Sequence, residues 1–268
     1  MKTFVSPGSW FSFQYPDSWC EFEEQSDGFL FYDPDEWKGN FRIQAWRDVR
    51  KSYGKACVDD EVRNGGARLT QVGTWQAAKS EESFVEEWLA YTNHYWLVGF
   101  ENTCVECTYT IQKGFPCSLG EQMVASLKIN SIDAFFSDCL IPVRLAEMTE
   151  IDNACSQLER IAKKAYKLQF KDFSQSLEML QRLVDGNELK QFGAEANVML
   201  GLAVCALVAE NVDGYEWRTY INRKEEKPVL VKDNILSADP HALFAPSLSG
   251  ANVSDAVEKI LLSAKKKD

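Results

Sequence analysis

The amino-acid sequence predicts an α+β protein of two domains, an antiparallel sheet with flanking helices followed by a mostly helical domain. The chain has 268 residues, about twice the usual single-domain size of roughly 100 to 150. Seven of its eight tryptophans lie before residue 131, and aromatic side chains favour sheets. After residue 130 the apolar period becomes helical. We therefore expect domains at residues 1–130 and 147–268, joined by a junction at 131–146.

Alternating apolar side chains predict the first strands. Residues 11–15 and 41–45 alternate, and residues 28–32 are apolar on both faces. A meander of short antiparallel strands is expected. The cleanest alternation, residues 104–112, is expected to pair with residues 94–101 through a turn at Asn102 and Thr103.

Two helices should flank this sheet. One is predicted at residues 52–64, closed by Gly65 and Gly66, which accept the backbone conformation that ends a helix. The other is predicted at residues 118–129, with Ser118 as its N-cap.

Helical periodicity organises the second domain. An apolar stripe runs over residues 148–165, and Asp172 with Gln175 forms a capping-box variant before the next helix. Residues 189–211 are apolar on almost all faces over their second half, which predicts a central helix.

A small β-hairpin is expected next, from residues 216–222 and 229–231, before a last helix ending near residue 263 and capped by Asn252 or Ser254. The junction contains Phe135, Phe136, Leu140 and Ile141. Such an apolar segment should pack against a domain.

Charge and hydropathy exclude several partners. A net charge of −11 repels phosphate backbones, so we expect no nucleic-acid binding, and the lysines at 265–267 are interpreted as a solvated tail. The N-terminus lacks the apolar core of a signal peptide, which predicts a cytoplasmic protein. The longest apolar stretch, residues 196–209, is too short to span a bilayer.

The eight cysteines lack the repeated close pairs of a structural zinc site, and a reducing cytoplasm should keep them as free thiols. Disulfides stay open as an alternative if a signal peptide was removed from the natural protein. Cys104 and Cys107 form one C-x-x-C, but a strand would direct them to opposite faces, which favours a structural role.

No catalytic, cofactor-binding or metal-binding residue is predicted. The chain has two histidines, His94 and His241, and neither lies in a nucleophile signature. Acidic pairs such as Glu81 and Glu82 are interpreted as a solvated face, because adjacent carboxylates rarely converge on one cleft. Glycine loops of the nucleotide-binding kind are absent from the sequence.

Residues 13–19, a strand that ends in Tyr-Pro-x-x-Trp, resemble the start of the PsbP-like fold of the photosystem II extrinsic subunit and the yeast Ran-interacting import factor. The resemblance covers roughly residues 4–130 and implies an adaptor that binds a partner protein. Residues 147–262 resemble an uncharacterised bacterial helical domain family. The resemblance rests on four short motifs: Leu177-x-x-Leu180-Gln181, Leu200-Gly201, Glu216-x-Arg218 around Trp217, and Phe244-Ala245-Pro246. The whole chain resembles a two-domain bacterial protein of unknown function.

Exposed aromatic side chains are the candidate binding residues. Trp10 and Trp46 fall opposite the apolar faces of their strands, and Trp37 lies in a polar turn. Alternatively, helices cover them. We expect a non-catalytic binding or protein-interaction module, its partner recognised by an aromatic patch or a groove between the domains. The alternative is a hydrolase-like enzyme with a cysteine or carboxylate site assembled from distant residues.

Overall fold

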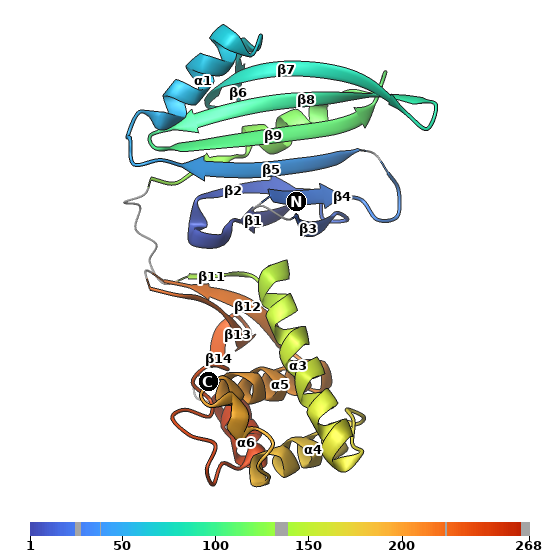
Figure 1. Ribbon diagram of the computed structural model, residues 1–268, viewed down its shortest axis with the longest axis vertical. Coiled ribbons are helices and arrows are strands. Elements are labelled where there is room, and N and C mark those ends of the chain that lie inside the picture. Colours follow the sequence, from blue (N-terminus) through green and yellow to red (C-terminus); the bar gives the residue numbers. More distant parts are fainter. Residues whose placement is uncertain (25–27, 38, 132–138, 223, 264–268) are drawn as a thin grey trace. The chain divides into compact units, whose positions relative to one another are not determined.

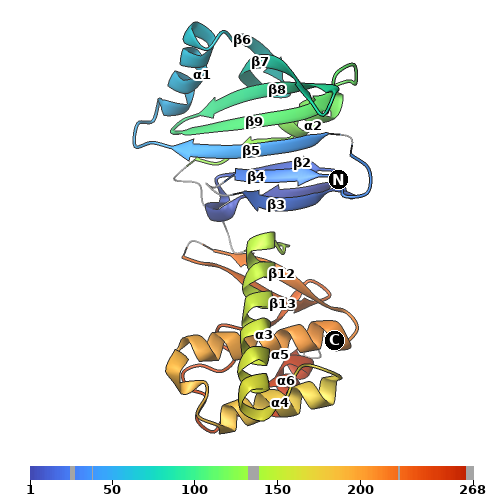
Figure 2. The ribbon, with the colours of Figure 1, turned by 45° about the vertical axis from the view of Figure 1, so that its right-hand side comes forward.

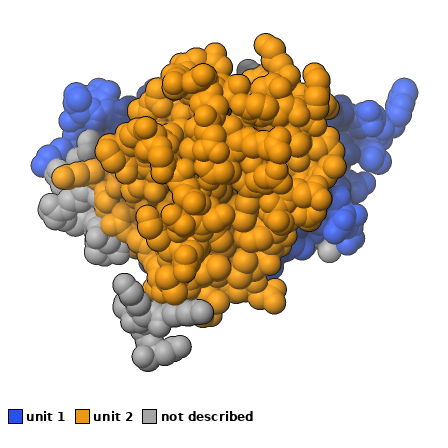
Figure 3. Space-filling view, turned by 90° about the horizontal axis from the view of Figure 1, so that it is seen from below, with its two compact units in different colours: residues 1–135 blue, residues 136–268 orange. Residues whose placement is uncertain are grey.

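The computed structural model describes residues 1–24, 28–37, 39–131, 139–222 and 224–263 (Figure 1). The chain forms two compact units, residues 1–135 and 136–268, which are coloured separately in Figure 3. Each unit has its own core, and each is described by itself.

A seven-stranded antiparallel sheet forms most of unit 1 (Figures 1 and 2). In spatial order its strands are β3 Cys20–Glu24, β4 Gly28–Tyr32, β5 Asn40–Arg47, β9 Thr103–Gln112, β8 Leu89–Phe100, β7 Trp75–Glu86 and β6 Arg68–Val72. Because β9 enters between β5 and β8, the order departs from the simple meander that the sequence predicts.

One face of this sheet, the inner face, is covered by a second sheet and a helix. The second sheet has the order β1 Lys2–Val5, β2 Phe11–Tyr15 and β10 Lys128–Ile129, with the short helix η1 Pro7–Ser9 between its first two strands. Helix α2, Ser118–Ala125, packs beside it. The alternating residues of β2 face the core as predicted, since Phe11, Phe13 and Tyr15 are all buried. This core also contains Trp96 and Tyr109, both of them almost completely buried.

The opposite, outer face is covered by α1, Tyr53–Asn64, at one end of the strands. Val58 of α1 packs there against Ala78 of β7. The helix approaches so closely that a Cβ on Gly54 or on Gly99 would collide with backbone atoms of the other segment. Only glycine allows this contact between α1 and β8.

Three local predictions for unit 1 are wrong. The β8–β9 turn consists of Glu101 and Asn102, because Thr103 already pairs with Phe100. Helix α2 ends at Ala125 rather than near residue 129, since Lys128 and Ile129 join β2 as strand β10. Its N-cap position is occupied by Cys117 rather than Ser118.

Four helices build the core of unit 2 (Figure 1): α3 Leu145–Tyr166, α4 Phe173–Asp185, α5 Glu195–Asn211 and α6 Val253–Ser263, with the short helix η2 Lys190–Phe192 before α5. Helix α5 is buried along most of its length, as its apolar sequence predicts. Asp172 accepts a hydrogen bond from the Gln175 amide, and Asn252 caps α6. Among the described helices, none is long and apolar enough to cross a membrane.

The β-structure of unit 2 is larger than the predicted hairpin. It is a four-stranded antiparallel sheet of β11 Cys139–Pro142, β12 Tyr215–Ile221, β13 Glu226–Lys232 and β14 Ile235–Ala238. The first strand comes from the predicted junction, where Leu140 pairs with Tyr220. Phe135 and Phe136 lie outside the described residues, as do the lysines at 265–267.

Candidate binding sites

The three candidate tryptophans lie at three separate places in unit 1. Trp10 is half-buried beside a cavity of about 370 Å³, with the Arg47 guanidinium 4.7 Å from its ring centroid. Trp46 is 40% exposed on the outer face, where it pairs with Cys104. Trp37 is 47% exposed and packs edge-on against Tyr91, with 5.4 Å between ring centroids.

The strand register keeps these tryptophans apart. Trp46 pairs with Cys104 near one end of β9, whereas Tyr91, the neighbour of Trp37, pairs with Gln112 at its other end. These partners are eight residues apart on β9, which corresponds to roughly 26 Å of strand. A single patch that includes all three tryptophans is therefore not formed.

Trp37 belongs to another apolar surface, which the sequence analysis missed. We call it the hairpin strip and define it by five residues, Trp37, Phe84, Trp88, Leu89 and Tyr91. Phe84 and Tyr91 are a cross-strand pair whose rings stack at 5.5 Å. Trp88 is 98% exposed and Leu89 is 47% exposed. Phe84, Leu89 and Tyr91 lie on the outer face of the β7–β8 hairpin and Trp88 lies at its tip. Figure 1 shows the long hairpin that these two strands form.

The tip of the hairpin is held in an unusual backbone conformation. Glu87 and Trp88 form the two-residue loop, with φ values of 47° and 70°. Positive φ at both positions is what a type I′ turn requires, and Asn-Gly normally supplies it. A bulky residue there is strained by about 1 to 3 kcal/mol, and such strain clusters at functional positions.

Beyond Lys79, the hairpin and the strand β9 that follows it carry only acidic charges. Residues 80–112 contain six glutamates and neither Lys nor Arg. On β7 the outer face alternates Glu82, Phe84 and Glu86, so carboxylates flank the strip. The signal in the sequence was the run Glu86-Glu87-Trp88-Leu89, which places a tryptophan among charges between two alternating segments.

The C-x-x-C pair has the arrangement expected of strand residues. Cys104 pairs with Trp46 on the outer face and Cys107 pairs with Ile43 on the inner face, so the two sulfurs diverge. Both thiols are free and buried, and burial raises the pKa of each well above its usual range.

His94 lies in a charged cluster between β7, β8 and α2. Its Nδ1 is 3.4 Å from a Glu81 carboxylate oxygen. Lys79, almost completely buried, forms ion pairs with Glu81 at 3.7 Å and with Glu121 at 3.0 Å. The hydrogen bond from Lys79 holds the pKa of the Glu121 carboxyl below its usual value. Both carboxylates of the cluster are therefore already paired with Lys79.

This cluster does not activate a nucleophile. The Cys117 thiol donates a hydrogen bond to Glu121 at 3.4 Å, and burial is the main cause that raises its pKa. A catalytic cysteine needs a lowered pKa. The second histidine, His241, contacts Glu150 at 3.2 Å in unit 2. Within the described part of the chain, no group of three or more His, Cys, Asp or Glu side chains is placed to hold a metal ion.

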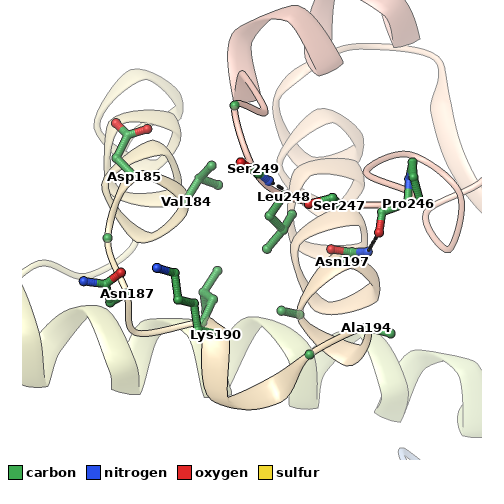
Figure 4. Close-up of a pocket in the computed structure, with 15 residues that line it drawn as sticks. Val184, Asp185, Asn187, Lys190, Ala194, Asn197, Pro246, Ser247, Leu248 and Ser249 are labelled. Carbon is green, nitrogen blue, oxygen red and sulfur yellow. Dashed lines mark hydrogen bonds between the residues drawn. The ribbon is translucent and has the colours of Figure 1, made fainter.

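Unit 2 contains a separate cavity of about 650 Å³ (Figure 4). It lies between the end of α4, η2, the start of α5 and the segment 246–250. Val184, Leu189 and Leu248 supply apolar walls, and Lys190 and Asn197 supply polar groups. This volume falls within the roughly 300 to 1,000 Å³ that small-molecule sites occupy.

Comparison with known protein families identifies the family of the chain. Residues 1–152, more than half of the chain, match the family described as "Domain of unknown function (DUF3805)". The chain belongs to this family. Residues 176–246 match a second one, "Domain of unknown function (DUF3806)". The hairpin strip lies within the first matched segment and most of the cavity lining within the second.

Solved structures extend the likeness to the whole chain. A crystal structure from Bacteroides thetaiotaomicron VPI-5482 is 34% identical, with a TM-score of 0.89, and the alignment covers 97% of this chain and 98% of that chain. No curated protein matches the chain.

Two further solved structures are similar to part of the chain. The solution structure of PsbP (CyanoP) from Synechocystis sp. PCC 6803 is 12% identical over 48% of this chain and 92% of that chain, with a TM-score of 0.24. The crystal structure of LpqN, "involved in cell envelope biogenesis of Mycobacterium tuberculosis", is 13% identical over 45% and 83%, with a TM-score of 0.29. Likenesses this distant determine neither the fold nor the function of this member of the family.

Proposed function

We propose that this protein is a non-catalytic binding module that attaches to a partner protein through the hairpin strip of unit 1. The observation that carries the proposal is Trp88, which is 98% exposed at the tip of a projecting hairpin. Tryptophan is enriched among the residues that dominate binding energy at protein interfaces, because it buries a large rigid surface. A nearly bare indole next to further exposed apolar side chains is therefore a candidate anchor.

Side-chain hydrogen bonds connect the strands that carry Trp88 to the neighbouring strand β9. On the same outer face Thr110 donates to Asn93 at 2.7 Å, and Asn93 donates to the Tyr95 hydroxyl at 2.9 Å. Tyr95 in turn donates to Glu82 at 3.3 Å. These bonds link β9, β8 and β7 beside the strip, so the backbone that carries it loses less conformational entropy on binding.

The charges around the strip define the partner. Glu82, Glu86 and Glu87 flank the apolar side chains, and residues 80–95, the part of the hairpin nearest its tip, contain neither Lys nor Arg. Complementary potentials speed association and exclude like-charged proteins. The partner surface should therefore be an apolar pocket for Trp88 with Lys or Arg at its rim.

Selection of phage-displayed random peptides on the full chain tests the proposal. Wild-type protein should select peptides that combine aromatic or aliphatic residues with Lys or Arg. Trp88→Ser should weaken their binding by about tenfold or more, and added salt should weaken it further. The matched control is Trp46→Ser, a half-exposed tryptophan at the other end of the strands. Acidic peptides, or peptides that bind Trp88→Ser as well as wild type, would contradict the proposal.

A further inference from the structure

The cavity of unit 2 exposes a side-chain oxygen that accepts no hydrogen bond from the described part of the protein. Asn197, at the start of α5, is only 9% exposed. Its Nδ2 donates to the Pro246 carbonyl at 3.3 Å, which fixes the orientation of the amide. In Figure 4 its Oδ1 is turned toward the cavity, and within the described ranges no donor reaches it. This oxygen is therefore open to a hydrogen-bond donor that enters the cavity.

The cavity also holds a cation with no ion-pair partner. Lys190 extends from η2 into the space between the end of α4 and the segment 246–250 (Figure 4). Among the described residues, none forms a salt bridge with its Nζ. The nearby acid, Asp185, is directed away from the cavity in Figure 4 and accepts a hydrogen bond from Gln181 at 2.9 Å. Lys190 is therefore available to an anion from outside.

The remaining lining sets the size and charge of a ligand. Val184 and Leu248 approach from opposite sides (Figure 4), and the buried Leu189 also lines the cavity. These side chains form a surface for a short aliphatic or aromatic group. Because Asp185 is directed away, Lys190 supplies one positive charge to the cavity, which matches a single negative charge better than the double charge of a phosphate ester.

We propose that this cavity binds a small organic acid that carries a hydrogen-bond donor next to its carboxylate and a short apolar group. The carboxylate pairs with Lys190, the donor, a hydroxyl or amino group, binds Asn197 Oδ1, and the apolar group packs on Val184 and Leu248. The 2-hydroxy and 2-amino acids have this chemistry. The site is separate from the hairpin strip, so either proposal can fail without the other.

Three matched probes test the chemistry in titrations of the full chain followed by NMR. The first probe, 2-hydroxy-4-methylpentanoate, has all three features. The second, 4-methylpentanoate, lacks the donor, and the third, 4-methylpentane-1,2-diol, lacks the acid. The backbone amides of Gly186, Gly193 and Gly250 line the cavity and report binding there. The first probe should saturate these shifts at millimolar concentration or below, and each of the others should bind about tenfold more weakly or worse.

Substitutions of the cavity residues test whether Lys190 and Asn197 bind the probe. Lys190→Met should weaken the first probe by about tenfold or more, because it removes the ion pair. Lys171→Met, at another exposed lysine of unit 2, is the matched control and should leave affinity unchanged. Asn197→Leu, which has a similar volume and no acceptor, should abolish the preference for the donor-bearing acid. If that variant does not fold, the Lys190 and Lys171 pair decides the outcome.

Several results would overturn the inference. They are an absence of shifts at the cavity glycines for all three probes, equal affinity for the acid and the diol, and unchanged affinity in Lys190→Met. Trp88→Ser provides the link to the proposed function, because it should leave probe binding unchanged. Loss of peptide binding with intact probe binding separates the two sites.

Discussion

The two faces of the seven-stranded sheet use tryptophan in opposite ways. On the inner face Trp96 is fully buried in the core under α2 and the small sheet. On the outer face the α1 helix covers one end of the strands, and the hairpin strip at the other end remains exposed. Both surfaces arise from the same alternating pattern of β7 and β8. The difference shows that a pattern of aromatic residues identifies a sheet but does not show which face a helix will cover.

The largest expected effect separates a core tryptophan from an exposed one. Trp96→Ala should lower the free energy of unfolding by about 3 to 5 kcal/mol, because it leaves a cavity among packed rings. Trp88→Ala should change it by about 0.5 kcal/mol or less, since the side chain packs on little. Urea titrations of the two variants measure both values. A comparable loss in Trp88→Ala would show that the tip supports the fold.

A methyl group at the contact between α1 and the outer face should have the next largest effect. Gly99→Ala places a Cβ against the backbone of Gly54. We expect a loss of about 1 to 3 kcal/mol in unfolding free energy, because neither backbone segment can move far. The same denaturation measurement checks it. An unchanged midpoint would mean that the α1 end of the face is as loosely packed as the hairpin end.

Relaxing the hairpin tip should raise stability and remove binding together. The double variant Glu87→Asn with Trp88→Gly places the preferred type I′ pair at the two positive-φ positions. Unfolding free energy should rise by about 0.5 to 1 kcal/mol, whereas binding of the selected peptides is lost with the indole. Glu87→Asn alone keeps Trp88 and is the control that should still bind. A double variant less stable than wild type would show that the loop is not strained.

The smallest expected effect concerns the acidic side of the pH profile. The pKa of Glu121 lies below its ordinary value of 4.5, mainly because Lys79 donates a hydrogen bond to it. A carboxyl with a lowered folded-state pKa stabilises the protein above its ordinary pKa, and that contribution is lost as pH falls through the lowered value. Glu121→Gln should therefore show a slightly shallower loss of stability below pH 4.5 than wild type. Acid denaturation curves of wild type and Glu121→Gln with the same slope below pH 4.5 would contradict this expected difference.

Local patterns predicted most elements of the fold, and long-range pairing accounts for the differences. The alternation at residues 11–15 correctly predicted a strand with a buried face, and the apolar stretch in α5 correctly predicted a central helix. The sheet of unit 2 was underestimated because β11 is a four-residue strand whose partner, β12, lies more than 70 residues later in the chain. Similarly, the two residues of β10 continue directly after a helix, and only their pairing with β2 makes them a strand.

The candidate sites were harder to predict because exposure depends on what packs above a residue. Trp37 was singled out as a turn residue, but its place beside Tyr91 depends on the register of β8 and β9. Trp88 was not singled out, although its acidic neighbours were visible in the sequence. The unpartnered Oδ1 of Asn197 gives no sequence signal at all, since a buried asparagine in a helix usually has its partners.

The exposure of Trp88 also makes the protein an optical reporter of its own state. Indole emission moves to shorter wavelengths when water leaves the ring, and dissolved quenchers reach only rings that are open to solvent. Of the eight tryptophans, Trp88 is 98% exposed while Trp19 and Trp96 are almost completely buried. The most accessible and longest-wavelength part of the fluorescence should therefore come from the hairpin tip, so that occupancy there can be followed without attaching a dye.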